Sequence, residues 1–169
     1  MPTVSNSPTT PTLASGLIHR ALGWWRGLHG LLDSLQPAAA LLARGYVAEA
    51  FFKSGLTKLR DWDSTLALFQ DEYKVPLLPT DVAAVMGTGG ELVLPVLLLL
   101  GLGARLGALG LSVINGVAVL SLAEIAPAAL QQHITWGVLL AGVAIFGNGR
   151  WSLDTWLLQR WPMLDKRMR

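Results

Sequence analysis

The sequence predicts an all-α integral membrane protein, in which an interfacial amphipathic helix precedes a transmembrane four-helix bundle and a short cytoplasmic helix follows it. Only 14% of the 169 residues are charged, against roughly 25% in an ordinary soluble domain. The mean hydropathy is +0.47, and the apolar residues gather in long runs. A soluble domain of this size has too little interior to bury so many apolar side chains, so we expect a lipid bilayer around the chain.

The N-terminal region divides into a tail and a helix. Residues 1–15, MPTVSNSPTTPTLAS, carry no charge and lack the basic start and apolar core of a signal peptide. This composition is typical of a disordered tail. Residues 16–36 place apolar side chains on one helical face and contain two tryptophans, which favours a helix lying in the membrane interface. A helix packed on the bundle is an open alternative.

Residues 37–149 form the predicted transmembrane domain, with spans over 37–59, 81–102, 104–123 and 133–149. Each has roughly the length that a hydrocarbon core of about 30 Å requires. The loop after the first span holds Arg60 and Lys74 against five carboxylates, whereas basic residues collect before the first span, in the turn after the second and in the tail 150–169. The positive-inside rule therefore predicts that both termini are cytoplasmic. In the tail, Ser152 is a good N-cap for the short helix.

The first span contains charges that hydrocarbon disfavours. Each charge near a helix centre costs about 2.5–3.5 kcal/mol, while Leu, Val or Phe contributes only about −0.3 to −0.6 kcal/mol. Arg44 and Lys58 lie nearer the ends and can extend to the membrane surface. Glu49 and Lys53 are four residues apart and can pair. We therefore expect the charged face of this helix to point toward its neighbours.

The second span adds Glu91, four residues before Pro95, and a helix kink is expected at this proline because it removes a main-chain hydrogen bond. Counting about 1.5 Å per residue, the non-snorkelling polar side chains of the spans fall at similar depths in the outer half of the membrane. The candidate intramembrane polar cluster is therefore Glu49, Lys53, Glu91 and Asn115, with Glu124 and His133 at the outer mouth. These groups either satisfy one another and fix helix packing, or line an outward-facing cavity that binds a polar head group or handles protons.

Several kinds of chemistry are excluded. The chain has no cysteine, so disulfides, thiolate metal sites, iron–sulfur clusters and CxxC relays are absent. Of the three histidines only His133 lies near a span, and a bis-histidine haem site needs two. No metal site is predicted, although Glu91, Glu124 and His133 could meet around one. No catalytic residue is predicted, and a net charge of +2 gives no sign of a nucleic-acid partner.

Three segments together resemble the DoxX family of small four-helix membrane proteins: RGYVAEAFFKSGLTKLRDW, ELVLPVLLLLGLGARLGALGL and GNGRWSLD, within residues 38–155. The family pattern has an Arg opening the first helix, a Ser-Gly-x-x-Lys-Leu motif, a Glu before a Leu-rich run, a Gly-Leu-x-x-Arg turn and a Ser-Leu-Asp ending. These elements correspond here to Arg44, Ser54, Gly55, Lys58, Leu59, Glu91, Gly101, Leu102, Arg105 and Ser152 to Asp154. Lys53 and the tryptophan-rich N-terminal helix depart from this pattern.

The resemblance implies a multi-pass protein of the bacterial inner membrane. Relatives have been described as membrane partners of redox proteins, including a thiosulfate:quinone oxidoreductase and oxidative-stress complexes, and others accompany iron-dependent, peptide-modifying oxidases. We therefore expect a membrane subunit that passes reducing equivalents from a redox partner toward quinone, without a covalently bound cofactor. Glu49, Lys53 and Glu91 would contact or protonate the quinone head group. The alternatives are a non-catalytic anchor or assembly factor docked through the acidic outer loop, and a small transporter that acts as a homo-oligomer.

Overall fold

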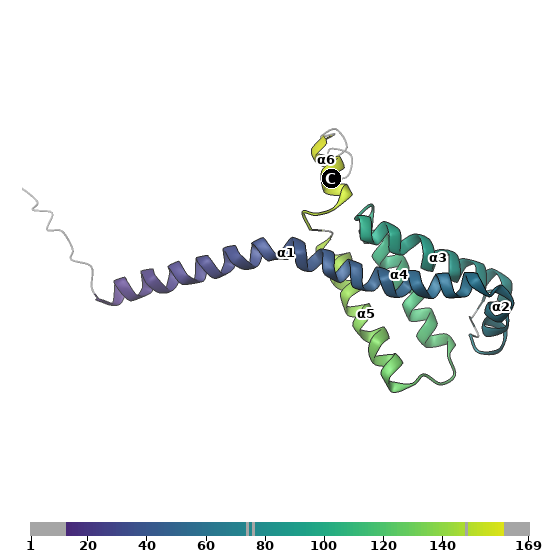
Figure 1. The fold of residues 1–169 in the computed structure, drawn as a ribbon. Coiled ribbons are helices and arrows are strands. Elements are labelled where there is room, and N and C mark those ends of the chain that lie inside the picture. Colours follow the sequence, from purple (N-terminus) through teal and green to yellow (C-terminus); the bar gives the residue numbers. More distant parts are fainter. Residues whose placement is uncertain (1–12, 74, 76, 148, 161–169) are drawn as a thin grey trace, which may run out of the picture. The chain divides into compact units, whose positions relative to one another are not determined.

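The computed structural model describes residues 13–73, 75, 77–147 and 149–160, with side chains from residue 19 onward. Within these residues the chain is all helical, as predicted, and has no strand (Figure 1). Much of the predicted N-terminal tail, residues 1–12, and the end of the basic tail, residues 161–169, lie outside the described part. The helices are α1 (Leu13–Arg60), α2 (Trp62–Asp71), α3 (Thr80–Leu100), α4 (Ala104–Ser121), α5 (Pro127–Phe146) and α6 (Leu153–Arg160).

Three of the described helices, α3, α4 and α5, are long and apolar enough to cross a membrane. They correspond to the second, third and fourth predicted spans. The fourth prediction was wrong at its start, because α5 begins at Pro127 rather than at residue 133; a proline suits the first turn of a helix, where its missing N–H has no partner to lose. The first predicted span lies in α1 and is not among the three, since its charged residues lower its hydropathy.

The chain divides into two compact units, residues 1–36 and 37–169, and α1 contributes to both. In the first unit, α1 begins at Leu13, so residues 13–15 are helical rather than part of the predicted tail. Every side chain from residue 19 to 36 is exposed, including Trp24 and Trp25. The ring of Trp25 packs edge-on against His29, with 4.6 Å between centroids.

In the second unit, one hydrophobic core draws side chains from α1, α3, α4 and α5. The first turns of α4 contribute small residues to it: Ala104 and Ala108 are fully buried, and a Cβ at Gly107 would lie 3.4 Å from the main-chain oxygen of Leu94. Lipid tails are as apolar as the helices, so helices in a membrane associate through close packing. Small side chains allow this close approach. The buried members of this core are Val47, Phe51, Leu98, Ala104, Ala108, Leu111, Leu140 and Val143.

Helix α2 covers the N-terminal end of α3, in a segment that the sequence analysis expected to be a loop. Asp61 caps α2 by accepting hydrogen bonds from the main-chain N–H (3.0 Å) and the hydroxyl (2.6 Å) of Ser64. These bonds lower the pKa of the Asp61 carboxyl. Phe69 then packs with Ala83 and Ala84 of α3 in a second small core. The N-cap of α2 and this core therefore make the acidic segment a lid over the N-terminal end of α3.

At the opposite end, residues of the family pattern fasten α6 to the turn between α3 and α4. Asp154 accepts hydrogen bonds from the N–H of Gly103 through both carboxylate oxygens, at 3.0 and 2.9 Å. Its own N–H donates to the oxygen of Gly101. Ser152 is the N-cap, as predicted, since its hydroxyl accepts from the N–H of Thr155 at 3.2 Å. Gly101 has a φ of +69°, a conformation that favours glycine.

Arg44 lies at this end too, and the expectation that it extends to the membrane surface was wrong. Its side chain is completely buried and donates to the carbonyl oxygens of Trp151 (2.6 Å) and Ala40 (3.3 Å). A third carbonyl, that of Leu99, lies 3.5 Å away in the last turn of α3. The Leu99 carbonyl is at a helix C-terminus, where carbonyls carry partial negative charge, and this charge helps to compensate the buried guanidinium.

Candidate functional site

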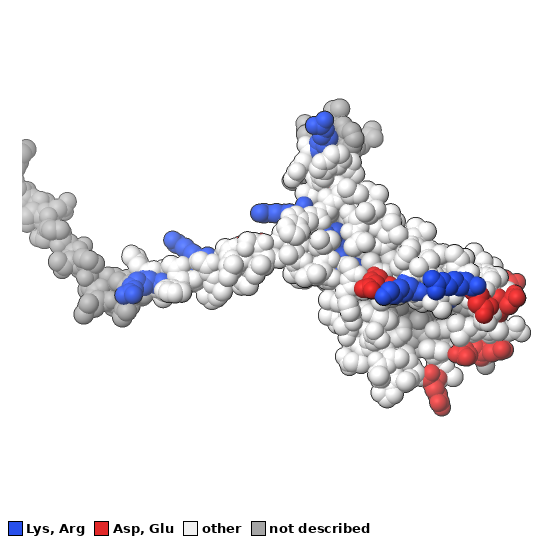
Figure 2. All heavy atoms as spheres, viewed as in Figure 1, with Lys and Arg blue, Asp and Glu red and all other residues white. Residues whose placement is uncertain are grey.

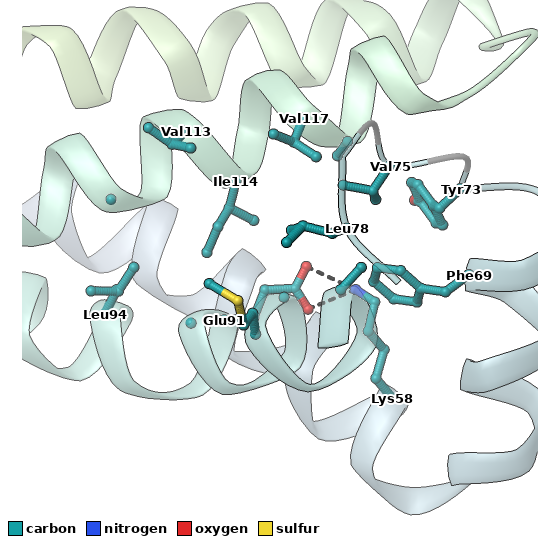
Figure 3. Close-up of a pocket in the computed structure, with 16 residues that line it drawn as sticks. Lys58, Phe69, Tyr73, Val75, Leu78, Glu91, Leu94, Val113, Ile114 and Val117 are labelled. Carbon is teal, nitrogen blue, oxygen red and sulfur yellow. Dashed lines mark hydrogen bonds and ion pairs between the residues drawn. The ribbon is translucent and has the colours of Figure 1, made fainter. Parts of the chain in front are cut away.

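An apolar cavity of about 420 Å³ lies between α3, α4 and a lid, which is formed by α2 together with Tyr73, Val75 and Leu78. Val113, Ile114 and Val117 of α4 form one wall (Figure 3). Phe69 and Tyr73 lie opposite, at the lid. This volume is within the range of small-molecule sites, roughly 300–1,000 Å³.

The charged groups of the cavity are Lys58 and Glu91. The ammonium of Lys58 donates to Oε1 and Oε2 of Glu91, at 2.8 and 2.6 Å, and to the hydroxyl of Ser54 at 2.9 Å. Only 13% of the Lys58 side chain and 10% of the Glu91 side chain are exposed. All three N–H donors of the ammonium are therefore used, as a buried cation requires. Figure 3 shows the pair at the edge of the apolar cavity.

The Ser-Gly-x-x-Lys motif of α1 builds this pair. Ser54 and Lys58 are one helical turn apart, so the hydroxyl lies beside the ammonium. Gly55 faces α3, where a Cβ would lie 3.0 Å from both Cβ of Glu91 and Cγ of Leu92. The missing side chain at Gly55 thus brings α1 close enough for the lysine to reach the carboxylate.

Glycines also shape the cavity between α3 and α4. A Cβ at Gly90 would lie 2.5 Å from Cδ1 of Ile114, and one at Gly110 would lie 2.7 Å from Cδ1 of Leu94. On the lid side, a Cβ at Gly87 would lie 3.1 Å from the ring of Phe69. Larger residues at these positions would push the cavity walls apart or fill the space.

Tyr73 brings a phenol to the lid side of the cavity. Burial raises the pKa of this phenol, and the negative charges of Glu91 and Glu72 raise it further. Tyr73 therefore stays protonated and can donate a hydrogen bond at neutral pH. The sequence analysis did not select this residue, because it lies in the segment expected to be a loop.

The predicted polar cluster is divided by the structure. Glu91 pairs with Lys58, a residue that the sequence analysis did not include in the cluster. Glu49 and Lys53 pair with each other at 2.6 Å, as their spacing predicted, but their side chains are 63% and 71% exposed instead of facing neighbouring helices. Lys58, expected to extend to the membrane surface, is turned inward because Glu91 and Ser54 accept its three hydrogen bonds.

The remaining predicted residues lie apart from the cavity. Asn115 of α4 and His133 of α5 are joined by two hydrogen bonds: Nδ2 of Asn115 donates to the main-chain oxygen of His133 (2.9 Å), and Oδ1 lies 2.7 Å from Nδ1 of the ring. Glu124 is exposed between α4 and α5. Pro95 is buried within α3, which continues through it as one helix. Arg105 is exposed and lies against Gly147.

A metal centre does not form among the residues that the structure describes. No group of three or more His, Asp or Glu side chains there is close enough to hold a metal ion. The set of Glu91, Glu124 and His133 considered from sequence is therefore not assembled, because Glu91 is engaged by Lys58 and His133 by Asn115.

The comparisons with known proteins agree with the motifs. Residues 39–124 match the family model described as DoxX. A protein of Haemophilus influenzae, described as an uncharacterized protein, is 30% identical over 131 residues, which cover 72% of this chain and 85% of that protein. No solved structure matches. The family match includes Arg44, the Ser54–Lys58 motif and Glu91.

Proposed function

Since the chain belongs to the DoxX family and is a membrane protein, we propose that it is the membrane subunit of a quinone-linked oxidoreductase or oxidative-stress redox complex. The observation that carries this proposal is the Lys58–Glu91 ion pair at the wall of an apolar cavity. Charged groups inside a membrane domain are costly, and they mark functional sites more often than packing contacts.

The cavity fits a quinone head group. Apolar walls on α3, α4 and the lid suit the ring, and Lys58, Tyr73 and Glu91 add polar atoms to the lining. The Tyr73 phenol donates a hydrogen bond to a ring carbonyl. The Lys58 ammonium does so when one of its hydrogen bonds to Glu91 is exchanged for one to the ligand, and the Glu91 carboxylate released in this way exchanges a proton with the bound molecule. A quinone, when bound, accepts two electrons and two protons, and the electrons come from a redox partner protein.

The membrane topology proposed here has four spans, with residues 37–60 of α1 as the first. This part of α1 runs antiparallel along α3: a Cβ at Gly45 would lie 3.9 Å from Leu99, and Gly55 lies against Glu91. Val47 and Phe51 enter the same core as the three apolar helices. Because α3 is long enough to cross a bilayer, a helix packed along it occupies the same hydrocarbon layer.

Location and orientation follow from the charges. The α2 end carries exposed carboxylates and is placed on the extracytoplasmic side of the bacterial inner membrane. The opposite end carries Arg150 and Arg160 and is placed in the cytoplasm, with both termini. The N-terminal part of α1 is proposed as an interfacial helix, because Trp24, Trp25 and Leu28 are exposed beside Arg20 and Arg26.

The proposal is tested by titrating the purified protein in lipid nanodiscs with a ubiquinone or menaquinone analogue. We expect saturable binding that Glu91→Gln and Lys58→Met each weaken. Glu49→Gln is the matched control, because it also removes a carboxylate from an ion pair but lies outside the cavity. Equal affinity in all three variants, or no saturable binding to the folded wild type, contradicts the proposal.

A second candidate function, a docking anchor for a partner protein, is favoured by the acidic surface around α2. Figure 2 shows acidic side chains gathered at this end of the second unit. The anchor is supported if a stable partner co-purifies in mild detergent and is lost when these acids are changed to Asn or Gln. Under this alternative the protein shows no quinone binding. The exposed acids are Asp61, Asp63, Asp71, Glu72, Asp81 and Glu124.

A further inference from the structure

The Glu49–Lys53 ion pair has no covering within the described part of the chain. Its side chains are 63% and 71% exposed, whereas those of the cavity pair, Lys58 and Glu91, are 13% and 10% exposed. Glu49, Lys53 and Lys58 belong to the same stretch of α1, whereas Glu91 belongs to α3. The chain therefore buries the pair that joins α1 to α3 and presents the pair within α1 on the outer surface of that helix.

The exposed pair lies deep in the hydrocarbon layer. Gly55 packs against Glu91, which is near the middle of α3. At 1.5 Å per residue, Lys53 is about 3 Å along the axis from Gly55, and Glu49 is about 9 Å from it. Further toward the N-terminus of α1, a Cβ at Gly45 would lie 3.9 Å from Leu99, near the end of α3. This depth rests on the proposed function, in which residues 37–60 cross the membrane.

Hydrogen-bonding capacity is also left over at this pair. Within the described residues, the Lys53 ammonium makes one hydrogen bond, to Oε1 of Glu49 at 2.6 Å, and Oε2 of Glu49 makes none. An ammonium has three donors and a carboxylate accepts through both oxygens. Lipid chains offer neither donors nor acceptors, so another protein surface must meet these groups.

The surrounding face of α1 has the spacing of a helix–helix seam. Leu42, Tyr46, Glu49 and Lys53 follow one another at intervals of four, three and four residues, and all four are exposed. This heptad spacing is the pattern by which two parallel helices pack along one another. Beside it, a groove of about 260 Å³ is lined by Gly45, Ala48, Glu49, Phe52, Pro95, Val96 and Leu99.

We propose that this face binds a second copy of the same chain, so that α1 packs against α1 about a two-fold axis along the membrane normal. Two copies inserted in the same orientation present the same face to each other. Glu49 of each copy then lies beside Lys53 of the other, and the two ion pairs close into a ring of four alternating charges. The leftover oxygen of each Glu49 accepts from the second copy's Lys53. The surface is self-complementary because each copy presents both an acid and a base, one helical turn apart.

Cross-linking in lipid vesicles tests the contact directly, because the natural chain has no cysteine. Tyr46→Cys places a thiol in the seam, and Val138→Cys is the matched control, since Val138 is 67% exposed on α5. At low protein-to-lipid ratio, oxidation is expected to give at least about tenfold more disulfide dimer with Tyr46→Cys than with Val138→Cys. Equal yields overturn the proposal. The proposal is also overturned if the Tyr46→Cys thiol forms disulfides only with a different protein.

Charge exchange between copies tests the ring. Glu49→Lys and Lys53→Glu, each combined with Tyr46→Cys, give one chain with two bases and one with two acids at the seam. Each alone is expected to lose cross-linking by about tenfold or more, because like charges meet in the dimer. Mixing the two is expected to restore it. Failure of the mixture to cross-link, while the unaltered Tyr46→Cys chain does, overturns the proposed ring.

Two further readouts separate this inference from the proposed function. Phe52 is exposed and lies about 4.5 Å along the axis from Gly55, near the middle of the proposed span. Labelling of Phe52→Cys by a water-soluble maleimide in intact vesicles would show that residues 37–60 do not cross the membrane, and overturns both. Quinone titration of the same vesicles reads the cavity independently. Dimers without quinone binding overturn the proposed function alone, and quinone binding by a chain whose Tyr46→Cys thiols do not cross-link overturns the dimer alone.

Discussion

Lys58 of α1 donates to both carboxylate oxygens of Glu91 of α3, so the lysine of one sequence motif and the acid of another form a single buried unit. Gly55 makes this contact geometrically feasible, and Ser54 completes the hydrogen bonds of the ammonium. The pair stands beside the cavity instead of filling it. Stability and ligand binding are therefore both expected to depend on Lys58 and Glu91, and the two effects can be measured separately.

Removing one member of the pair is expected to destabilise the protein more than removing both. Glu91→Gln leaves the Lys58 ammonium without its counter-charge, at a cost of about 3–5 kcal/mol. The double variant Lys58→Met, Glu91→Gln removes the buried charge altogether and should recover a large part of that loss. Thermal unfolding in detergent measures both. A double variant no more stable than Glu91→Gln would contradict this account of the pair.

A side chain at Gly55 is expected to separate α1 from α3. Its Cβ would meet Glu91 and Leu92 at 3.0 Å, so Gly55→Val should cost about 1–3 kcal/mol of stability through overpacking. Gly89→Val is the matched control, because nothing lies within 4 Å of a Cβ there. Chemical unfolding in detergent distinguishes the two variants. Equal losses would mean that the helices do not approach at Gly55.

Filling the cavity is expected to weaken ligand binding without unfolding the chain. Ala118 lines the cavity, so Ala118→Phe occupies space that a head group needs. Leu120, two residues on, is 83% exposed and absent from the lining, which makes Leu120→Phe the control. We expect quinone-analogue affinity to fall about tenfold or more in the first variant only. A similar affinity in both would place the ligand elsewhere.

Asp154→Ala is expected to release α6 and leave the cavity intact. The half-buried N–H of Gly103 loses its carboxylate acceptor, at a cost of about 1 kcal/mol or more. Limited proteolysis should then cleave more rapidly within residues 149–160, while quinone-analogue affinity stays unchanged. Gln159→Ala, an exposed change on the same helix, controls for altered protease recognition. Unchanged cleavage would show that other contacts hold α6.

The fold class followed from sequence because hydropathy and length act locally. The apolar runs of α3, α4 and α5 and the N-cap at Ser152 needed no knowledge of neighbours. Helix α2 was not predicted, because the acidic residues of that segment indicated a loop. The cue was Asp61 three residues before Ser64, a capping arrangement ahead of the apolar residues Leu66 and Phe69.

The candidate site was only partly predictable. Spacing along one helix correctly paired Glu49 with Lys53, but it does not say which face of α1 turns toward α3. That choice is made by Gly55, whose missing side chain admits α3 on the side of Lys58. The position of Arg44 was also predicted wrongly. Its acceptors are main-chain carbonyls of α1, α3 and the segment before α6, and these carbonyls come together only in the folded chain.

The central claim, that the cavity beside Lys58 and Glu91 holds a quinone head group, is tested most directly by photoaffinity labelling. A photoreactive quinone analogue is bound to the protein in nanodiscs, irradiated, and the adducts are located by mass spectrometry. The account predicts adducts on the cavity walls, in residues 69–94 and 110–118, that an unlabelled quinone competes away. Adducts that resist competition, or that map only outside these segments, would contradict it.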